Sequence, residues 1–157
     1  APNSADLQPV AQDYITRLLN HLNYVGVLTL ELFVTDKGLY ANEMAPRVHN
    51  SGHWSIEGAV CSQFENHIRA VAGLPLGSTE VVRPTVMINI IGQYPQSEQV
   101  LALEGVHLHL YNKEEREGRK IGHLTLMPND TAQLTTLCRQ LAKILPNPLA
   151  LSEDMTI

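Results

Sequence analysis

Glu31 is the residue that fits least well with its neighbours. It interrupts a run from Val25 to Val34 that is otherwise almost entirely apolar, and this composition predicts a β-strand. A carboxylate that is buried without a partner costs several kcal/mol, so something must compensate its charge. We therefore expect Glu31 to meet a compensating group in the folded chain.

The turn after this run predicts where that group lies. Residues 36–38 (Asp-Lys-Gly) are typical of a three-residue hairpin loop, and a second strand is predicted over residues 39–45. Counting back along both strands places Glu31 opposite Glu43. Facing like charges destabilise a ladder, whereas Mg²⁺ binds carboxylate oxygens and keeps waters and substrate phosphates. The pair therefore predicts a magnesium site; the alternative is a register off by one residue, with one carboxylate in solvent.

The polar loop after the second predicted strand offers donors for an anion beside this pair. Its members are Arg47, His49, Asn50, Ser51 and His53. His49 and His53 also have the spacing of a zinc pair, but that spacing requires a helix, and the sequence offers no convincing third ligand. Asn50 and Ser51 are also suited to capping the helix that follows.

A second charged segment, residues 112–120, gathers four basic side chains around one predicted turn: Lys113, Arg116, Arg119 and Lys120. Arg supplies forked donors and Lys a point charge, so the cluster suits a phosphate group. The alternative is a solvated turn of mixed charge, since three Glu residues are interleaved.

The elements that must position these groups follow from apolar periodicity and turn residues. A helix is predicted from about residue 7 to 22, with apolar residues at three- and four-residue steps, and a second from about 56 to 72. Further strands are predicted at residues 85–91, 106–111 and 120–127, and a last helix at 130–145. The segment 92–99 is the predicted domain boundary, which gives domains 1–92 and 93–157. The expected fold class is α+β.

Composition limits the possible functions. Eleven basic and sixteen acidic residues give a net charge of −5, which argues against sequence-independent nucleic-acid binding. The longest apolar stretch is too short to span a membrane and contains Glu31. Cys61 and Cys138 make neither a disulfide framework nor a zinc signature, which favours a reducing cytoplasm. The chain starts without Met and without a signal peptide, so we expect a piece of something longer.

Two blocks of this sequence resemble one known family. Residues 31–54 read ELFVTDKGLYANEMAPRVHNSGHW, and residues 118–123 read GRKIGH, preceded by KE at 113–114. Both resemble the 5-(carboxyamino)imidazole ribonucleotide synthases, also called the ATPase subunit of phosphoribosylaminoimidazole carboxylase. The resemblance covers residues from about 18 to 145. Its Asn-Glu pair is typical of ATP-grasp ligases in general, whereas the Arg-Val-His-Asn-Ser-Gly-His-Trp run narrows it to this branch.

The resemblance implies a fold and a reaction. The first part of the chain would be the C-terminal lobe of an ATP-grasp domain, with antiparallel strands backed by helices, and the second a small β-rich domain. The enzyme would be a cytoplasmic homodimer that acts in purine biosynthesis. Its reaction would use ATP to activate bicarbonate as carboxyphosphate. The amine of 5-aminoimidazole ribonucleotide then captures the carboxyl group.

The same resemblance implies roles for individual residues. Glu31 and Glu43 would hold Mg²⁺ against the ATP phosphates, with Asn42 next to the nucleotide. Arg47 and His49 would orient bicarbonate or carboxyphosphate. The substrate would be bound by Asn50, Ser51, Lys113, Arg119 and Lys120, with Lys113 also catalytic; whether Arg116 or Arg119 touches phosphate stays open.

Departures from the family pattern and rival functions remain. No glycine-rich phosphate loop occurs in these 157 residues, so the chain by itself is expected to be inactive. The rival enzymes are other ATP-grasp ligases, of the formate-dependent purine transformylase or biotin carboxylase type. The rival of another class is a regulatory or dimerisation module that has kept the lobe without its chemistry.

Overall fold

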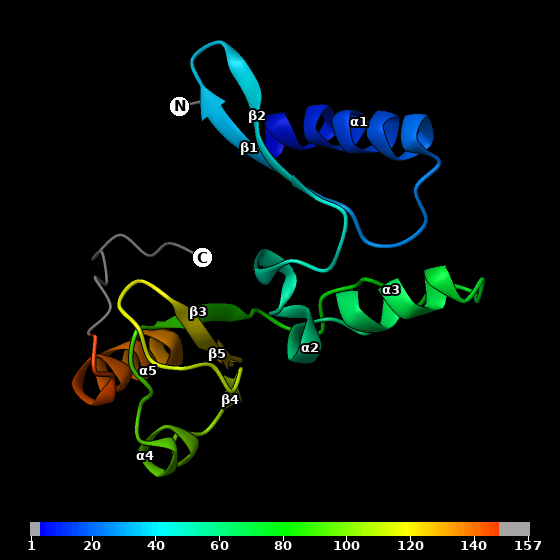
Figure 1. Cartoon of the computed structure of the whole chain (residues 1–157). Helices are drawn as coiled ribbons and strands as arrows, with labels where there is room; N and C mark the ends of the chain where they lie inside the picture. The colour runs from blue at the N-terminus through cyan, green and yellow to red at the C-terminus, as the bar shows by residue number, and fades with distance from the viewer. Residues whose placement is uncertain (1–3, 148–157) are drawn as a thin grey trace. The chain divides into compact units, whose positions relative to one another are not determined.

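The computed structural model describes residues 4–147 and divides them into two compact units (Figure 1). The first unit runs to Ile56 and adds Val60–Thr79; the second comprises Glu57–Ala59 and the residues from Glu80 onward. Each unit combines helices with one antiparallel sheet. The expected α+β class is therefore confirmed.

The first unit is built on helix α1 (Ser4–Leu22) and a hairpin of strands β1 (Thr29–Thr35) and β2 (Gly38–Ala45). The helix lies along one face of the hairpin in Figure 1. Leu30 and Leu32, which alternate along β1, line a groove on this face together with Ala11 and Ile15 of the helix. The predicted apolar helix face thus serves to cover one side of the ribbon.

The register of the hairpin differs from the prediction at its turn. Thr35 pairs with Gly38, so the connection has two residues, Asp36 and Lys37, instead of three. Gly38 has a φ of 115°, which a side chain would strain. The ladder then shifts between Glu31 and Leu32, since Leu32 pairs with Ala41. This bulge leaves Asn42 as the extra residue.

The two differences cancel at the predicted pair. A two-residue turn with a regular ladder would place Asn42 opposite Glu31. The bulge restores the residue lost at the turn, so Glu31 pairs with Glu43. The predicted pairing is confirmed, although the register that led to it was wrong for every pair between this one and the turn.

The helix predicted over residues 56–72 is interrupted in the structure. A short helix α2 (Ser55–Gly58) follows a 3-10 helix (Asn50–Gly52), and α3 (Gln63–Val71) starts afresh. Between them, Ser62 caps α3, because its side chain accepts a hydrogen bond from the backbone N–H of Glu65 at 3.1 Å. The three- and four-residue spacing of apolar residues continues through this break, so the sequence pattern did not reveal it.

The second unit contains a three-stranded antiparallel sheet with the order β3-β5-β4. Strand β5 (Lys120–Leu126) lies between β3 (Val86–Ile91) and β4 (Val106–Leu110), and its residues from Ile121 onward are buried. Helices α4 (Ser97–Leu101) and α5 (Thr131–Ile144) complete the unit. Leu134, Leu137 and Leu141 of α5 belong to the same core as β5.

The compact units do not coincide with the predicted division between residues 92 and 93. Strand β3 precedes that point, yet it pairs with β5 over its whole length. The segment that was predicted to link two domains instead contains α4, and Gly92 donates its N–H to the carbonyl of Arg119 at 2.8 Å. No pattern in β3 itself indicates which sheet it joins.

Both cysteines are free thiols and buried, and burial raises the pKa of the Cys138 thiol. Cys61 lies in the break before α3, not in a helix as predicted. Within residues 4–147, every helix is too short or too polar to cross a membrane.

Candidate functional site

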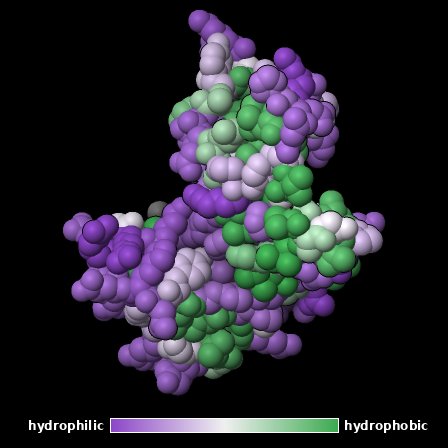
Figure 2. Space-filling model, turned by 45° about the vertical axis from the view of Figure 1, so that its right-hand side comes forward, coloured by the Kyte–Doolittle hydropathy of each residue, from purple (hydrophilic) through white to green (hydrophobic). Residues whose placement is uncertain are grey.

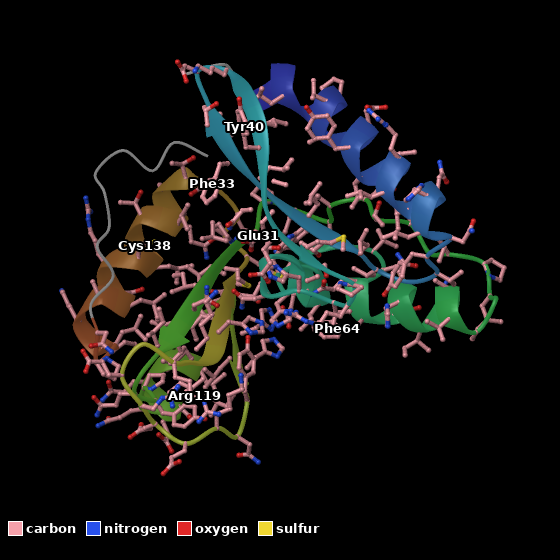
Figure 3. All side chains as sticks on the ribbon, turned by 45° about the horizontal axis from the view of Figure 1, so that its top comes forward. Glu31, Phe33, Tyr40, Phe64, Arg119 and Cys138 are labelled. Carbon is pink, nitrogen blue, oxygen red and sulfur yellow. The ribbon has the colours of Figure 1, made fainter. Side chains whose placement is uncertain are left out.

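The face of the hairpin opposite α1 carries the two carboxylates. Directly paired residues on an antiparallel ladder point to the same side, so Glu31 and Glu43 share this face. The next pair on this face toward the turn, Phe33 and Tyr40, is also exposed. Figure 3 labels Glu31, Phe33 and Tyr40 along the ribbon, with α1 on its other side. The result is an open surface with acidic groups beside apolar rings.

Glu31 is half-exposed in the hairpin, and not buried as its apolar flanks suggested. Its side chain keeps 39% of its area exposed, because the hairpin is a two-stranded ribbon within the described chain. Each of its oxygens faces a polar group. Asn42 donates from Nδ2 to Oε2 at 3.2 Å, and His49 Nε2 lies 3.4 Å from Oε1. The bulge is what allows Asn42 to reach the carboxylate.

The protonation of the His49 ring follows from its hydrogen bonds. Nδ1 accepts from the backbone N–H of Ser51 at 3.3 Å and lies 2.9 Å from the Ser51 hydroxyl. A nitrogen that accepts from an amide cannot carry a proton, so the proton of the neutral ring is on Nε2. His49 therefore presents an N–H to Glu31.

These contacts also correct the predicted cap. The 3-10 helix is capped by the His49 side chain, and Asn50 and Ser51 are its first residues instead of its caps. Arg47 remains exposed, and its guanidinium donates to the carbonyl of Val48 at 3.0 Å. The structure thus brings together Glu31, Asn42, His49 and Ser51.

The alternative zinc pair finds no support in the ring contacts. Nδ1 of His49 faces Ser51, and Nδ1 of His53 lies 2.8 Å from the Gln63 carboxamide. Over residues 4–147, no group of three or more His, Cys, Asp or Glu side chains is arranged to hold a metal ion. Gln63, which the sequence interpretation passed over, also contacts the backbone of His49.

The second unit brings together the basic residues of the 112–120 segment. Lys113 Nζ lies 5.1 Å above the centre of the Tyr111 ring and donates to the carbonyl of Lys120 at 3.4 Å. Tyr94 fixes the backbone of Lys113, since its hydroxyl accepts from the Lys113 N–H at 2.9 Å and donates to the carbonyl at 2.7 Å. The side chain of Lys113 is thereby held beside the backbone of Lys120.

Arg119 is more constrained than Arg116. It is half-buried, its guanidinium donates to the carbonyl of Glu114 at 3.5 Å, and its N–H donates to the carbonyl of Arg116 at 3.0 Å. Figure 3 labels Arg119 beside the turn between β4 and β5. Arg116 is exposed, so its side chain is the freer of the two to meet a ligand.

A stacked pair of imidazoles, which was not predicted from the sequence, lies next to this turn. His109 of β4 and His123 of β5 are ladder partners with ring centres 4.4 Å apart and planes 8° from parallel. The Tyr111 hydroxyl lies 2.7 Å from His123 Nδ1, and His109 Nε2 lies 2.7 Å from a Glu57 oxygen. Alternation of polar rings at 107, 109 and 111 was the signal that could have indicated a common face.

Comparison with known families also divides the chain into two parts. The ATP-grasp domain family matches residues 1–64, and the phosphoribosylaminoimidazole carboxylase C-terminal domain family matches residues 85–136. These matches cover the carboxylate hairpin with its histidine loop and the basic turn, respectively.

Individual relatives agree with both matches. The N5-carboxyaminoimidazole ribonucleotide synthase of Pseudomonas aeruginosa is 58% identical over 134 residues, which are 85% of this chain and 37% of that protein. That of Escherichia coli is 49% identical, over 91% of this chain and 40% of the relative. The chain therefore spans about two fifths of the length of these relatives.

Solved structures of relatives are similar in fold to this chain. The N5-carboxyaminoimidazole ribonucleotide synthetase of Thermus thermophilus has a TM-score of 0.86 at 50% identity, covering 97% of this chain and 42% of that one. The Aspergillus clavatus synthase, solved with ADP and 5-aminoimidazole ribonucleotide, has a TM-score of 0.78 at 31% identity. It covers 93% of this chain and 42% of that one.

Proposed function

Because the chain belongs to the N5-carboxyaminoimidazole ribonucleotide synthase family, we propose that it carries the metal and substrate residues of an ATP-dependent carboxylating ligase. The reaction joins bicarbonate to the amine of 5-aminoimidazole ribonucleotide and consumes ATP, in purine biosynthesis. The observation that carries the proposal is the pairing of Glu31 with Glu43 next to His49.

The carboxylate pair fits Mg²⁺ bound together with ATP. Glu31 and Glu43 provide hard oxygen donors on an exposed face, and Mg²⁺ usually takes one or two carboxylates and fills its remaining positions with waters and phosphates. Bound there, the ion would reduce the repulsion between the triphosphate and an attacking anion. Asn42 would lie next to the nucleotide, and Phe33 and Tyr40 offer an apolar surface on the same face.

The histidine loop supplies the groups for the anionic partner. In the first step an oxygen of bicarbonate attacks the γ-phosphorus of ATP, which gives carboxyphosphate and ADP. Arg47 would neutralise the anion, and His49 would help to orient it from its position beside Glu31. In the second step the amine of the ribonucleotide attacks the carboxyl carbon, phosphate leaves, and a proton is lost from nitrogen.

The basic turn supplies the anchor for the phosphate of the ribonucleotide. Lys113, Arg119 and Lys120 would bind this substrate, supported by the fixed backbone of Lys113 and its contact with Lys120. Asn50 and Ser51 would add contacts from the other unit. Both groups of residues would thus serve the same small substrate.

The proposal extends to organisation. The first unit would act as part of the ATP-grasp domain, and the second unit, which includes β3, as the domain that contacts the ribonucleotide. We propose a homodimer in the cytoplasm as the working form of the enzyme.

The test of the substrate anchor uses a chimera in which this chain replaces the matching part of the Pseudomonas aeruginosa relative. In it, Lys113→Ala should lower turnover about 10- to 100-fold and raise the KM for the ribonucleotide, since a charged hydrogen bond contributes about 1.5–3 kcal/mol. The KM for ATP should hardly change. Steady-state kinetics with each substrate varied measures all three constants.

Lys143→Ala, on an exposed turn of α5, is the matched control for the loss of a positive charge. If Lys113→Ala and Lys143→Ala give the same kinetic constants, the basic turn is a solvated feature and has no part in the site.

The 157-residue chain alone is expected to show no bicarbonate-dependent ATP hydrolysis above background. It carries the proposed metal carboxylates, but it spans about two fifths of its relatives, and catalysis requires the nucleotide-binding parts to be assembled with them. Phosphate release measured beside the full-length Pseudomonas aeruginosa relative gives the comparison. Robust bicarbonate-dependent release from the purified chain would contradict this expectation.

A further inference from the structure

Gln63, the first residue of α3, binds the histidine loop through its side chain. Its carbonyl oxygen accepts from the backbone N–H of His49 at 3.0 Å, and its amide nitrogen donates to the backbone carbonyl of His49 at 2.7 Å. One carboxamide thus satisfies both backbone groups of a single residue fourteen positions earlier in the chain.

This double contact fixes the orientation of the carboxamide. The backbone N–H of His49 can only donate and its carbonyl can only accept, so the oxygen and nitrogen of Gln63 cannot be exchanged. The amide nitrogen also lies 2.8 Å from Nδ1 of His53. Because this nitrogen only donates, His53 Nδ1 must accept, and the ring proton of His53 is on Nε2.

The surroundings of Gln63 hold the carboxamide in this position. Its backbone N–H donates to the Ser55 hydroxyl at 3.0 Å, and that buried hydroxyl donates to the carbonyl of Gly52 at 2.6 Å. A side chain at Gly52 would have its Cβ 2.6 Å from the carboxamide oxygen of Gln63. A side chain at Gly52 would therefore displace the Gln63 carboxamide from this position.

We infer that Gln63 is a positioning residue, which fixes the backbone of His49 and sets the tautomer of His53. The inference rests on the proposed function in one respect: His49 and its loop are assigned there to the activated bicarbonate. Gln63 acts on that chemistry through the two histidines. It holds the backbone of the loop in which both rings present an Nε2–H donor, the tautomer of His49 being set by the Ser51 amide and that of His53 by Gln63.

The first test reads the tautomers directly in the 157-residue chain, by NMR of imidazole-labelled protein at a pH where the rings are neutral. The unsubstituted chain should show His53 with an unprotonated Nδ1 and a protonated Nε2. In Gln63→Glu, a carboxylate replaces the amide donor, so the proton of His53 should move to Nδ1. Gln99→Glu, the same change on α4 of the second unit, should leave His53 unaltered.

A second variant displaces Gln63 without replacing it. In Gly52→Ala the new methyl group occupies the position of the carboxamide, so His53 should lose its single tautomer although Gln63 is still present. The backbone amide of His49 should also exchange with solvent faster. An unsubstituted chain with the His53 proton on Nδ1, or Gln63→Glu and Gly52→Ala spectra without change at His53, would overturn the inference.

Kinetics of the chimera test the consequence for the reaction. Gln63→Glu should lower kcat about 10- to 100-fold with little change in the KM for ATP, as expected when groups that orient catalytic residues are disturbed. Equal constants for Gln63→Glu and Gln99→Glu in an active chimera would refute the positioning role. A chimera inactive without any substitution would count against the proposed function alone, since the NMR comparison decides independently whether Gln63 fixes the loop.

Discussion

Glu43→Gln is expected to lower ATP-dependent carboxylation by the chimera by at least about 100-fold. Glu43 is one of the two paired carboxylates on the exposed face of the hairpin, and replacement of a residue that merely supports a metal ligand already costs about 10- to 100-fold. The amide has nearly the same size and keeps one oxygen, so the hairpin should fold unchanged. The loss should therefore come from weaker binding of Mg²⁺ with ATP.

The measurement is kcat/KM over a range of Mg²⁺ concentrations, because weak binding is partly recovered at high magnesium whereas a folding defect is not. Glu104→Gln, at an exposed position before β4, is the matched control. A Glu43→Gln variant within about threefold of that control would remove the carboxylate pair from the reaction.

Leu124→Ala is expected to destabilise the second unit by about 2–5 kcal/mol. Leu124 has 0% of its area exposed, and it sits on the central strand β5 between Ile88 of β3 and Leu108 of β4. Truncation removes apolar contacts and leaves a cavity that the two flanking strands cannot easily fill. The first unit should keep its stability, because it has its own sheet.

Amide hydrogen exchange distinguishes the units, because the protection of β5 reports the opening of the second unit and that of β1 the opening of the first. Leu101→Ala, at a position 58% exposed on α4, should change the free energy of opening by less than about 0.5 kcal/mol. If β5 amides in Leu124→Ala are protected as well as in Leu101→Ala, the sheet is not the core of this unit.

The hairpin illustrates what could be predicted from sequence. An apolar run and a turn signal predicted both strands and the pairing of Glu31 with Glu43. The residues 36–38 were compatible with turns of two or three residues, and the choice between them depends on backbone geometry that composition does not encode. The bulge at Asn42 was equally invisible, since nothing in the residue type requires it.

Longer-range contacts set the remaining limits. The period of three and four continued from α2 into α3, so only the cap at Ser62 marked the break. Gln63 looks like any polar residue at the start of a helix until the backbone of His49 is placed beside it. His109 and His123 became neighbours through a register set across a long loop, which no local pattern specifies.

Exposed apolar side chains are numerous in the first unit, and Figure 2 shows apolar surface in green among the polar residues. On α3 and the segment after it, the exposed members include Ile68, Val71, Leu74 and Leu76. Where such side chains form a contiguous patch, the surface is typically covered in a functional assembly or promotes association.

The bulge at Asn42 increases the number of polar side chains that the hairpin can place around Glu31. In a regular strand, neighbouring residues point to opposite sides, so an Asn-Glu dipeptide could offer only one of its side chains to Glu31. The inserted residue interrupts this alternation once, so that both Asn42 and Glu43 lie next to the carboxylate of Glu31. Deleting Asn42 would leave Glu31 and Glu43 in pairing distance but would reduce the polar groups at that level from three to two. The chemistry of this ribbon is thus set by the length of the chain as much as by the identity of its residues.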